Sequence, residues 1–576
     1  MIATSLQATE HTVTLRDGTS LFYRAWLPAT PTDRALLLFH RGHEHSGRWQ
    51  ETVEALGLED VAVFAWDARG HGRSPGERGA APDLRVVVKD ADEFARHVAR
   101  HHDIPVENMV VLAHSVGGVI ATAWVHDYAP PIRGLILATP AFRVKLYVPF
   151  AVPLLRLRER LLGPGFVKSY VKATMLTHDR AQAEAYRADP LIFPQISVRM
   201  LLDLHDTSTR LLADAGAITV PTMLLVAGSD WVVKASAQRR FLADISSPVK
   251  RIETLPGFHH AIFHEKDRHL VVDKVREFVR ELFDRPPSAT SLLAADKHGY
   301  TKAEYARLCR RGGLRYAPVR WLMKTIGRIS GGVSLGWRSG FDSGVMLDYV
   351  YENRPQGFTP LGRMVDRSYL DSIGWRGIRV RRTNLEQLLQ QAIEEIAAAG
   401  RPVRLLDIAC GGGRYLLDTI HRLKHIPITA VLRDYKQENL DAAKRRADEL
   451  GLTNVRFVQG DAFDRAALAA IEPRPTIAIV SGLYELFPEN EPVLRSLHGL
   501  ADALEPDCRL IYTNQPWHPQ VEFIARTLTN REGRPWIMRR RNQTEMDELA
   551  RTAGFDKLSQ EIDPWGIFTV SLARRR

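Results

Sequence analysis

The chain has 576 residues and a formal net charge of +11, with 45% hydrophobic and 25% charged residues, a composition ordinary for globular protein. Its length exceeds what one hydrophobic core usually organises, so we expect more than one domain. The sequence contains no run of about 18 apolar residues, so we expect no membrane-spanning helix. The N-terminal residues predict no signal peptide, and three scattered cysteines indicate neither a disulfide framework nor a metal site, so we expect a cytoplasmic protein.

The first half of the chain alternates short apolar runs with longer segments that have one polar face. Because strands of this kind alternate with helices in α/β proteins, the pattern predicts a parallel sheet covered by helices on both faces. Residues 143–215 interrupt the alternation with an apolar stretch that contains Pro and Arg, and we expect an inserted lid there. The predicted strands are 35–40, 61–67, 108–114, 134–140 and 222–228.

A serine lies at the junction of one predicted strand and the next helix. In V-L-A-H-S-V-G-G at 111–118, Ser115 precedes a Gly-Gly pair, which is typical of the G-x-S-x-G nucleophile elbow, although Ala113 replaces the first glycine. A serine hydroxyl needs a histidine base and an orienting acid, and in this fold they follow in the order Ser, Asp, His. Asp230 follows the strand that ends near residue 228, and the loop at 256–265 then offers His259, His260 and His264.

Four segments around these residues resemble the monoacylglycerol lipase and lysophospholipase branch of the α/β-hydrolases, of serine aminopeptidase S33 type. They are H-R-G-H-E-H-S-G-R-W at 40–49, D-A-R-G-H-G-R-S-P-G at 67–76, L-T-H-D-R at 176–180 and A-D-P-L-I at 188–192. The resemblance covers about residues 10–285 and implies an α/β-hydrolase domain over residues 1–285. It also implies a triad of Ser115, Asp230 and His260.

The same resemblance implies an oxyanion hole made by the backbone N–H groups of Gly42 and Val116. Arg41 stands directly before the first donor, where the family has glycine. A cation at this place could recruit an anionic head group, which would favour a lysophospholipid over a neutral glyceride.

A Pro/Ser break at 284–288 predicts the end of the hydrolase domain. Residues 286–382 are basic and aromatic, and we expect a mostly helical connector there. The positive charge of this connector lies near Trp321, Leu322, Met323 and Trp375. These basic residues are either solvated at the protein surface or contact an anionic membrane surface. The basic residues are Lys302, Arg307, Arg310, Arg311, Arg315, Arg320, Lys324, Arg328, Arg376, Arg379, Arg381 and Arg382.

A second alternation of strands and helices is predicted over residues 383–576. Thr383-Asn384-Leu385-Glu386 has the pattern of a capping box that opens a helix ending at Gly400. The strand that follows runs into L-L-D-I-A-C-G-G-G-R at 405–414, a glycine-rich loop that lets the backbone approach a nucleotide. Further strands are predicted at 428–434, 455–464, 476–487 and 509–517, with an antiparallel edge at 566–573.

This half resembles class I S-adenosylmethionine-dependent methyltransferases with a Rossmann-like fold, and the unit from residue 290 resembles a methyltransferase family found attached to such hydrolases. Asp434 ends the second strand, where such enzymes bind the ribose, and Asp461-Ala462 occupies the turn that receives adenine. A glycine loop alone would equally fit a nicotinamide or flavin site; the Asp-Ala turn favours the methyl donor. The resemblance implies S-adenosylmethionine contacts at Asp407, Ala409, Gly411, Gly413, Asp434, Asp461 and Ala462.

Residues that contact the methyl acceptor are expected on the loops after the fourth and fifth strands. The candidates are Tyr484, Glu485, Asn514 and His518. Asn514-Gln515-Pro516-Trp517 faintly resembles the N-P-P-Y box of amino-methylating enzymes, but Gln515 breaks the pattern. We expect Trp517 to pack in the protein.

Together these features predict a bifunctional enzyme of lipid metabolism, a serine ester hydrolase fused to an S-adenosylmethionine-dependent methyltransferase. The first half would cleave an acyl ester, and the second would methylate a related lipid at its head group or at a freed carboxylate. We expect a lipid or acyl-ester substrate, contact with an anionic membrane surface, no metal and no nucleic acid. The alternative is an RNA or small-molecule methyltransferase whose hydrolase-fold domain is accessory or inactive.

Overall fold

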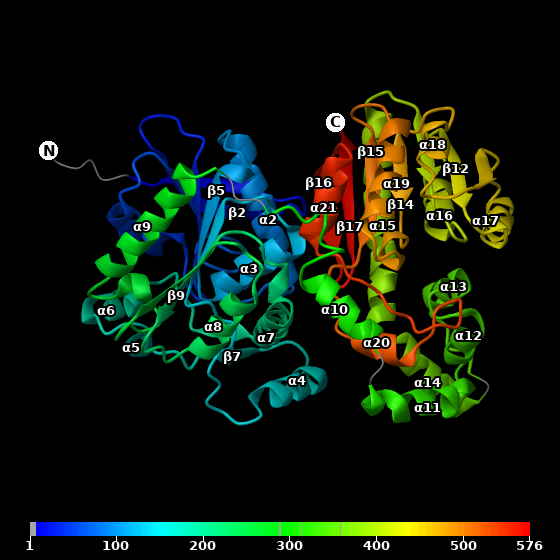
Figure 1. Ribbon diagram of the computed structural model, residues 1–576. Helices are drawn as coiled ribbons and strands as arrows, with labels where there is room; N and C mark the ends of the chain where they lie inside the picture. Colours follow the sequence, from blue (N-terminus) through cyan, green and yellow to red (C-terminus); the bar gives the residue numbers. More distant parts are fainter. Residues whose placement is uncertain (1–6, 287–289, 311–312, 358) are drawn as a thin grey trace. The chain divides into compact units, whose positions relative to one another are not determined.

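The computed structural model describes residues 7–286, 290–310, 313–357 and 359–576 (Figure 1). It consists of two compact units, Met1–Thr290 and Ser291–Arg576, which are described separately below. The predictions made for residues 1–6, Pro287, Ser288 and Arg311 lie outside the described residues. Within the described ranges, no helix has both the length and the apolar character needed to span a bilayer.

The first unit is built on a mixed sheet, and the described residues place eight strands in it, in the order β1-β2-β4-β3-β5-β6-β9-β10. β1 pairs antiparallel with β2 and β2 with β4, whereas the other neighbours are parallel. The expected α/β fold is confirmed, and the predicted runs form β3, β4, β5, β6 and β9. The strands are β1 (Thr9–Thr14), β2 (Ser20–Trp26), β3 (Ala35–Phe39), β4 (Ala62–Trp66), β5 (Met109–His114), β6 (Gly134–Ala138), β9 (Thr222–Ala227) and β10 (Lys250–Leu255).

Helices cover both faces of this sheet because the central strands are apolar on both sides (Figure 1). Val53 of α1 and Val275 of α9 belong to one core cluster with Leu36 and Leu112 of the sheet. Helix α3 is buried from Gly117 to Tyr128 and packs against α2 and α7. The covering helices are α1 (Gln50–Leu56), α2 (Leu84–His101), α3 (Val116–Tyr128), α7 (Val198–Ala213), α8 (Ala235–Asp244) and α9 (His269–Asp284).

The segment predicted as a lid, residues 143–215, lies between β6 and β9 and has its own elements. A two-stranded antiparallel hairpin, β7 with β8, is accompanied by short helices. Helix α4 has no buried residue and exposes large apolar side chains, which include Leu157, Leu161 and Leu162. Besides α7, the elements are α4 (Ala151–Leu162), β7 (Phe166–Lys168), α5 (Ala173–Leu176), α6 (Arg180–Ala188) and β8 (Gln195–Ser197).

The second unit contains a sheet in which the described residues form seven strands, in the order β13-β12-β11-β14-β15-β17-β16. The five strands from β13 to β15 are parallel, and β17 pairs antiparallel with both of its neighbours. This parallel-rich sheet confirms the expected Rossmann-like class, but the edge strand is β16, which the sequence analysis missed. The strands are β11 (Val403–Asp407), β12 (Ile428–Asp434), β13 (Val455–Gln459), β14 (Ile477–Val480), β15 (Arg509–Asn514), β16 (Phe555–Ile562) and β17 (Thr569–Arg575).

The prediction that a helix begins at Thr383 is wrong, because α15 (Ile373–Ala398) starts ten residues earlier and follows Ser372. The hydroxyl of Thr383 donates to the carbonyl of Arg379, one turn back, so the capping-box residues lie inside a continuous helix. The end of the helix near Gly400 agrees with the prediction. The helices that follow are α16 (Arg414–Arg422), α17 (Gln437–Glu449), α18 (Arg465–Ala469), α19 (Asn490–Ala503), α20 (Val521–Thr527) and α21 (Gln543–Thr552).

The segment predicted as a connector is helical and, from Ser291 onwards, is part of the second unit. Phe341, Met346, Leu370 and Trp375 form one core cluster with Phe568, which lies between β16 and β17. Buried Asp366 accepts hydrogen bonds from Ser330, Gly332, Tyr349 and Gln356, which ties the short helices together. These helices are α10 (Tyr300–Cys309), α11 (Ala317–Lys324), α12 (Gly331–Ser339), α13 (Gly344–Glu352) and α14 (Pro360–Leu370).

Candidate active sites

Ser115 lies on a sharp turn between β5 and α3. Its φ of 55° and ψ of −111° are a strained backbone conformation for a residue with a side chain. The following helix passes so close to β3 that a Cβ on Gly117 would lie 2.5 Å from the carbonyl oxygen of His40. Only glycine permits this approach, and the turn holds the Ser115 hydroxyl at the end of the sheet.

The three residues predicted to act together are joined by hydrogen bonds. Nε2 of His260 lies 2.8 Å from Oγ of Ser115, and Nδ1 of His260 lies 2.8 Å from Oδ2 of Asp230. All three side chains are buried, and they come from the loops after β5, β9 and β10. This is the arrangement in which a histidine can take a serine proton while the carboxylate orients the ring.

Further hydrogen bonds hold the acid and the base in place. Oδ1 of Asp230 accepts the backbone N–H groups of Val232 at 2.7 Å and Val233 at 2.9 Å. Burial opposes ionisation of Asp230, but His260 and these two amides outweigh it and hold the pKa of Asp230 below its ordinary value. The carbonyl of His260 accepts from the hydroxyl of Thr139 at 3.1 Å and is 3.0 Å from Nε2 of buried His114, so its loop is fixed to β5 and β6.

The two predicted oxyanion donors lie side by side. A Cβ on Gly42 would be 3.1 Å from Cγ2 of Val116, so the loop after β3 and the start of α3 are in contact. Among the described residues, neither the amide of Gly42 nor that of Val116 donates to a protein acceptor. Two adjacent free N–H groups next to a serine hydroxyl can bind a developing oxyanion.

Arg41 is buried and already paired. Its Nη2 donates to Oε1 of Glu44 at 2.7 Å, and its guanidinium lies over the ring of Tyr186, 5.0 Å from the centroid. The ion pair argues against the predicted contact between Arg41 and an anionic head group, because a protein carboxylate neutralises the charge. Glu44, which the sequence analysis did not single out, follows in the same loop.

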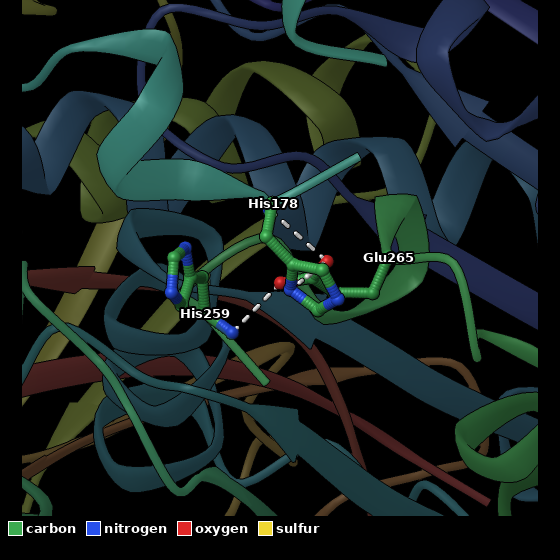
Figure 2. Close-up of side chains that lie close together, drawn as sticks. All are labelled: His178, His259 and Glu265. Carbon is green, nitrogen blue, oxygen red and sulfur yellow. Dashed lines mark hydrogen bonds and ion pairs between the residues drawn. The ribbon is translucent and has the colours of Figure 1, made fainter. Parts of the chain in front are cut away.

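Next to the triad, Glu265 joins the lid to the loop of His260 (Figure 2). Oε2 lies 2.8 Å from Nδ1 of His178 and accepts the hydroxyl of Thr177 at 3.0 Å, while Oε1 accepts the N–H of His259 at 2.8 Å. His178, His259 and Glu265 are metal-ligand types whose donor atoms lie within 4.8 Å of one another. Because donors already surround both oxygens of Glu265, an ion would have to displace existing hydrogen bonds.

In the second unit, the glycine loop after β11 carries the predicted nucleotide contacts. Gly411 has φ +53°, and no atom lies within 4 Å of a Cβ built on it, so its surroundings are open. Asp407 is fully buried, and its oxygens accept the N–H of Ala409 and the hydroxyl of Tyr415. Burial raises the pKa of Asp407 to about 7. Asp407 therefore shapes the loop, and Gly413, which has Leu432 at 2.7 Å from an added Cβ, lets the loop pack on β12.

Asp434 at the end of β12 faces this loop. Its Oδ2 accepts the N–H of Gly411 at 2.9 Å, and its Oδ1 accepts from the N–H of Lys436 and the side chain of Asn439, each at 2.9 Å. A carboxylate beside an open glycine loop at the end of parallel strands fits the ribose of an adenosyl group. The donor set therefore fits S-adenosylmethionine.

The predicted adenine turn lies after β13. Asp461 is exposed and accepts the N–H of Phe463 at 2.9 Å, whereas Ala462 is buried and its carbonyl accepts the hydroxyl of Ser496 at 2.6 Å. The exposed carboxylate and the apolar residue beside it suit a purine edge and a purine face, respectively.

The four candidates for the acceptor site divide into two pairs. Glu485 and His518 line a pocket of about 250 Å³. Tyr484 and Asn514 are structural: the hydroxyl of Tyr484 donates to Ser496, and the side chain of Asn514 donates to the carbonyl of Arg541. Trp517 is covered by the guanidinium of Arg540, as expected for packing.

The sequence analysis missed most of the pocket walls and misjudged part of the basic charge. Arg381, grouped there with surface residues, is only 6% exposed and lines the pocket with Trp375. Arg541 is also buried, and it donates to the carbonyls of Tyr484, Phe487 and Glu489, which fixes the loop that carries Glu485. A buried arginine has no signature in a single sequence that separates it from a surface one.

Comparisons with known proteins agree with this division. The family model described as "Serine aminopeptidase, S33" matches residues 30–267, and the one described as "Putative methyltransferase" matches residues 275–575. The chain is 50% identical over 577 residues to "Uncharacterized protein YnbC" of Escherichia coli (strain K12), and the match covers 98% of each chain. It is 28% identical over 275 residues to "Monoacylglycerol lipase" of Mycolicibacterium smegmatis, over 47% of this chain and 96% of the relative.

Among solved structures, a soluble variant of monoglyceride lipase from Saccharomyces cerevisiae matches 50% of this chain and 98% of its own, with 19% identity and a TM-score of 0.45. The family model that matches residues 275–575 spans more than half of the chain, and the relative from Escherichia coli matches it nearly end to end. The chain therefore belongs to the family described as "Putative methyltransferase", with a monoglyceride lipase-like hydrolase domain of the serine aminopeptidase S33 family in front of it.

Proposed function

We propose that the first unit is a serine ester hydrolase. The hydrogen-bonded chain from Ser115 through His260 to Asp230 is the observation that carries this proposal. His260 takes the proton as the Ser115 hydroxyl attacks the acyl carbonyl, and Asp230 stabilises the imidazolium that results. The proton then passes from His260 to the departing alcohol, and water releases the acyl group from Ser115 by the same route.

The amides of Gly42 and Val116 bind the carbonyl oxygen as it becomes negative. Removal of one such donor costs roughly 10²–10³-fold in kcat in enzymes of this kind. Ion-paired Arg41 stabilises the loop that presents the Gly42 amide, which gives this residue a role other than substrate recognition.

The relatives named "Monoacylglycerol lipase" and "Monoglyceride lipase" support an acyl glyceride or a related acyl ester as the substrate. The exposed apolar face of lid helix α4, with its arginines Arg156, Arg158 and Arg160, suits the interface of an anionic lipid aggregate. Exposed Trp321 and Leu322 beside Arg320 on α11 have the same character. We therefore propose that the enzyme works on lipids at such a surface.

We propose that the second unit binds S-adenosylmethionine and transfers its methyl group. The bound sulfonium supplies an electrophilic methyl group. Asp434 would hold the ribose, the open backbone at Gly411 would pass beside the amino-acid end, and Asp461 and Ala462 would meet the adenine. The pocket at the ends of β14 and β15 would hold the acceptor, because β14 is the neighbour of β11 in the sheet; desolvation and alignment there would supply much of the rate.

Labelling with a fluorophosphonate tests the hydrolase proposal. We expect one probe molecule on Ser115, identified by mass spectrometry, and no label on Ser115→Ala; a wild-type protein that takes up no probe would leave the hydrolase-fold domain as an accessory. Calorimetric titration with S-adenosylmethionine tests the second unit independently, because it needs no acceptor. If S-adenosylmethionine does not bind, the methyltransferase activity proposed for the second unit is refuted.

A further inference from the structure

The pocket at the ends of β14 and β15 has properties that restrict its ligand. Gly482 follows β14 and Gln515 follows β15, and Met323 of α11 and Trp375 and Arg381 of α15 belong to the other walls. The pocket has a volume of about 250 Å³. A cavity of this size suits a small molecule or one part of a lipid.

Aromatic side chains dominate the walls. Trp375 stacks against Trp536 with ring centroids 6.4 Å apart, and Tyr369 meets the edge of Trp375 at 5.8 Å. Phe523 and Phe568 complete this surface. A wall of this kind binds an apolar body through area burial and ring stacking, so the body of the ligand is apolar.

The charged groups of the lining are compensated by protein partners. Arg381 lies 3.8 Å from Glu485, and both side chains are less than a tenth exposed. Asp342 accepts the backbone N–H of Arg531 at 2.6 Å and its Nε at 3.2 Å. A carboxylate or phosphate entering this pocket would meet Glu485 as well as Arg381, and would gain no net attraction. The lining therefore favours an uncharged ligand.

His518 adds a neutral polar group. Burial and nearby Arg540 lower the pKa of His518 to about 3, so the ring is uncharged at neutral pH. Its Nδ1 accepts the N–H of Gln520 at 3.0 Å, which assigns the proton to Nε2. His518 thus offers one N–H donor and no charge.

Glu485 has one oxygen without a partner. Oε1 accepts the hydroxyl of Thr513 at 2.8 Å, whereas Oε2 is buried with no hydrogen-bond partner. A buried carboxylate oxygen left unpaired is costly, and ligand donors commonly complete such a group. Glu485 also lines the pocket, so a ligand with an O–H group can donate to its carboxylate, whereas a carboxylate ligand cannot.

Building on the proposed methyl transfer, we propose that the acceptor is a small uncharged apolar molecule with a free hydroxyl group, methylated on oxygen. The acceptor oxygen would bond to the methyl carbon while the methyl–sulfur bond breaks with its electron pair left on sulfur, and the hydroxyl proton would pass to the carboxylate of Glu485. Phenols and aliphatic alcohols share this chemistry. The proposal replaces the freed carboxylate expected from the sequence.

The test uses the full-length protein without methyl donor and two matched pairs of probes, 2-naphthol with 2-naphthoate and 1-decanol with decanoate. Calorimetry at pH 7 should show one alcohol binding at least tenfold more tightly than its carboxylate twin. The pair whose alcohol binds more tightly shows whether the acceptor is a phenol or an aliphatic alcohol. Equal or tighter binding of the carboxylates, or no binding of either alcohol, would overturn the proposal.

A substitution then tests the role of Glu485. Glu485→Gln should keep alcohol binding within about threefold but lower methyl transfer by about 10²-fold or more, the usual contribution of a positioned base. Because Arg381 loses its counter-charge, the variant should also bind the carboxylate twin more tightly than wild type does. Unchanged transfer and unchanged discrimination would remove Glu485 from the site.

Controls separate this inference from the proposed function. Exposed Glu491→Gln, on α19, should behave as wild type in every assay. If S-adenosylmethionine does not bind, the methyltransferase proposal fails. The preference of the pocket for alcohols over carboxylates can still be measured, because that titration contains no S-adenosylmethionine. If the melting curve shows that Glu485→Gln does not fold, the binding of the matched probes to the wild-type protein tests the proposal.

Discussion

Nδ1 of His178 lies 2.8 Å from Oε2 of Glu265, and this contact joins the lid to the loop that bears His260 (Figure 2). The carboxylate is fully buried and also accepts the hydroxyl of Thr177 and the N–H of His259. The position of the lid and that of the proposed base are thus held by one side chain.

Replacement of Glu265 by Ala should loosen the lid. Hydrogen bonds to a charged group contribute about 1.5–3 kcal/mol each, and the variant leaves several donors unpaired. We expect faster limited proteolysis between β7 and α6 and lower esterase activity, both measured against Glu184→Ala, an exposed position on α6. Proteolysis at the wild-type rate would show that other contacts hold the lid.

Asp230→Asn should keep the fold but lose about 10⁴-fold in kcat for ester hydrolysis, because an amide no longer holds the right tautomer of His260 or stabilises its cation. Ester turnover with a short-chain chromogenic ester measures the effect. Asp273→Asn, at an exposed site on α9, serves as the control. Retention of a tenth or more of the wild-type rate would contradict the assigned role.

The buried pair of Arg41 and Glu44 should behave as a unit. Arg41→Met removes the closer of two cations paired with buried Glu44, since Arg48 lies 3.6 Å from the same carboxylate oxygen. The variant should destabilise the protein by about 3 kcal/mol, whereas Arg41→Met with Glu44→Leu should recover most of this loss. Urea unfolding of the three proteins measures the difference. A double variant no more stable than Arg41→Met would contradict the pairing.

The same pair gives a pH dependence. Burial raises the pKa of Glu44, but nearby Arg41, His264 and Arg48 outweigh it, and the pKa is held well below the ordinary 4.5. A depressed pKa in the folded state contributes stability that is full above about pH 4.5 and is lost as the pH falls. Urea midpoints of wild type should therefore fall more steeply from pH 5 to pH 3 than those of the double variant.

Asp434→Asn should weaken S-adenosylmethionine binding by about ten- to a hundredfold, the equivalent of about 1.5–3 kcal/mol for hydrogen bonds to a charged group. Calorimetric titration gives the dissociation constant directly. Asp441→Asn on α17, an exposed position whose carboxylate accepts a hydrogen bond from the Gln437 side chain, is the matched control. Equal affinity in both variants would move the ribose site elsewhere.

Several features of the chain could be predicted because they are local. A strand that ends in Ser115 before Gly-Gly, and another that ends before Gly411 and Gly413, specify turns by steric rules that act over a few residues. The order of Ser115, Asp230 and His260 followed from the fold class. Local rules failed at Thr383, where a capping pattern lies inside α15, because packing of Trp375 and Ile378 extends that helix backwards.

By itself, the sequence determined the two α/β units, the nucleophile turn and the glycine loop, since each depends on short-range periodicity and backbone sterics. Only the tertiary structure decided which charges are available to ligands. Arg41 and Arg381 are indistinguishable from surface arginines in a sequence, yet Glu44 neutralises one and Glu485 the other. Burial and pairing arise when segments far apart in the chain meet, and the electrostatics of both sites follow from them.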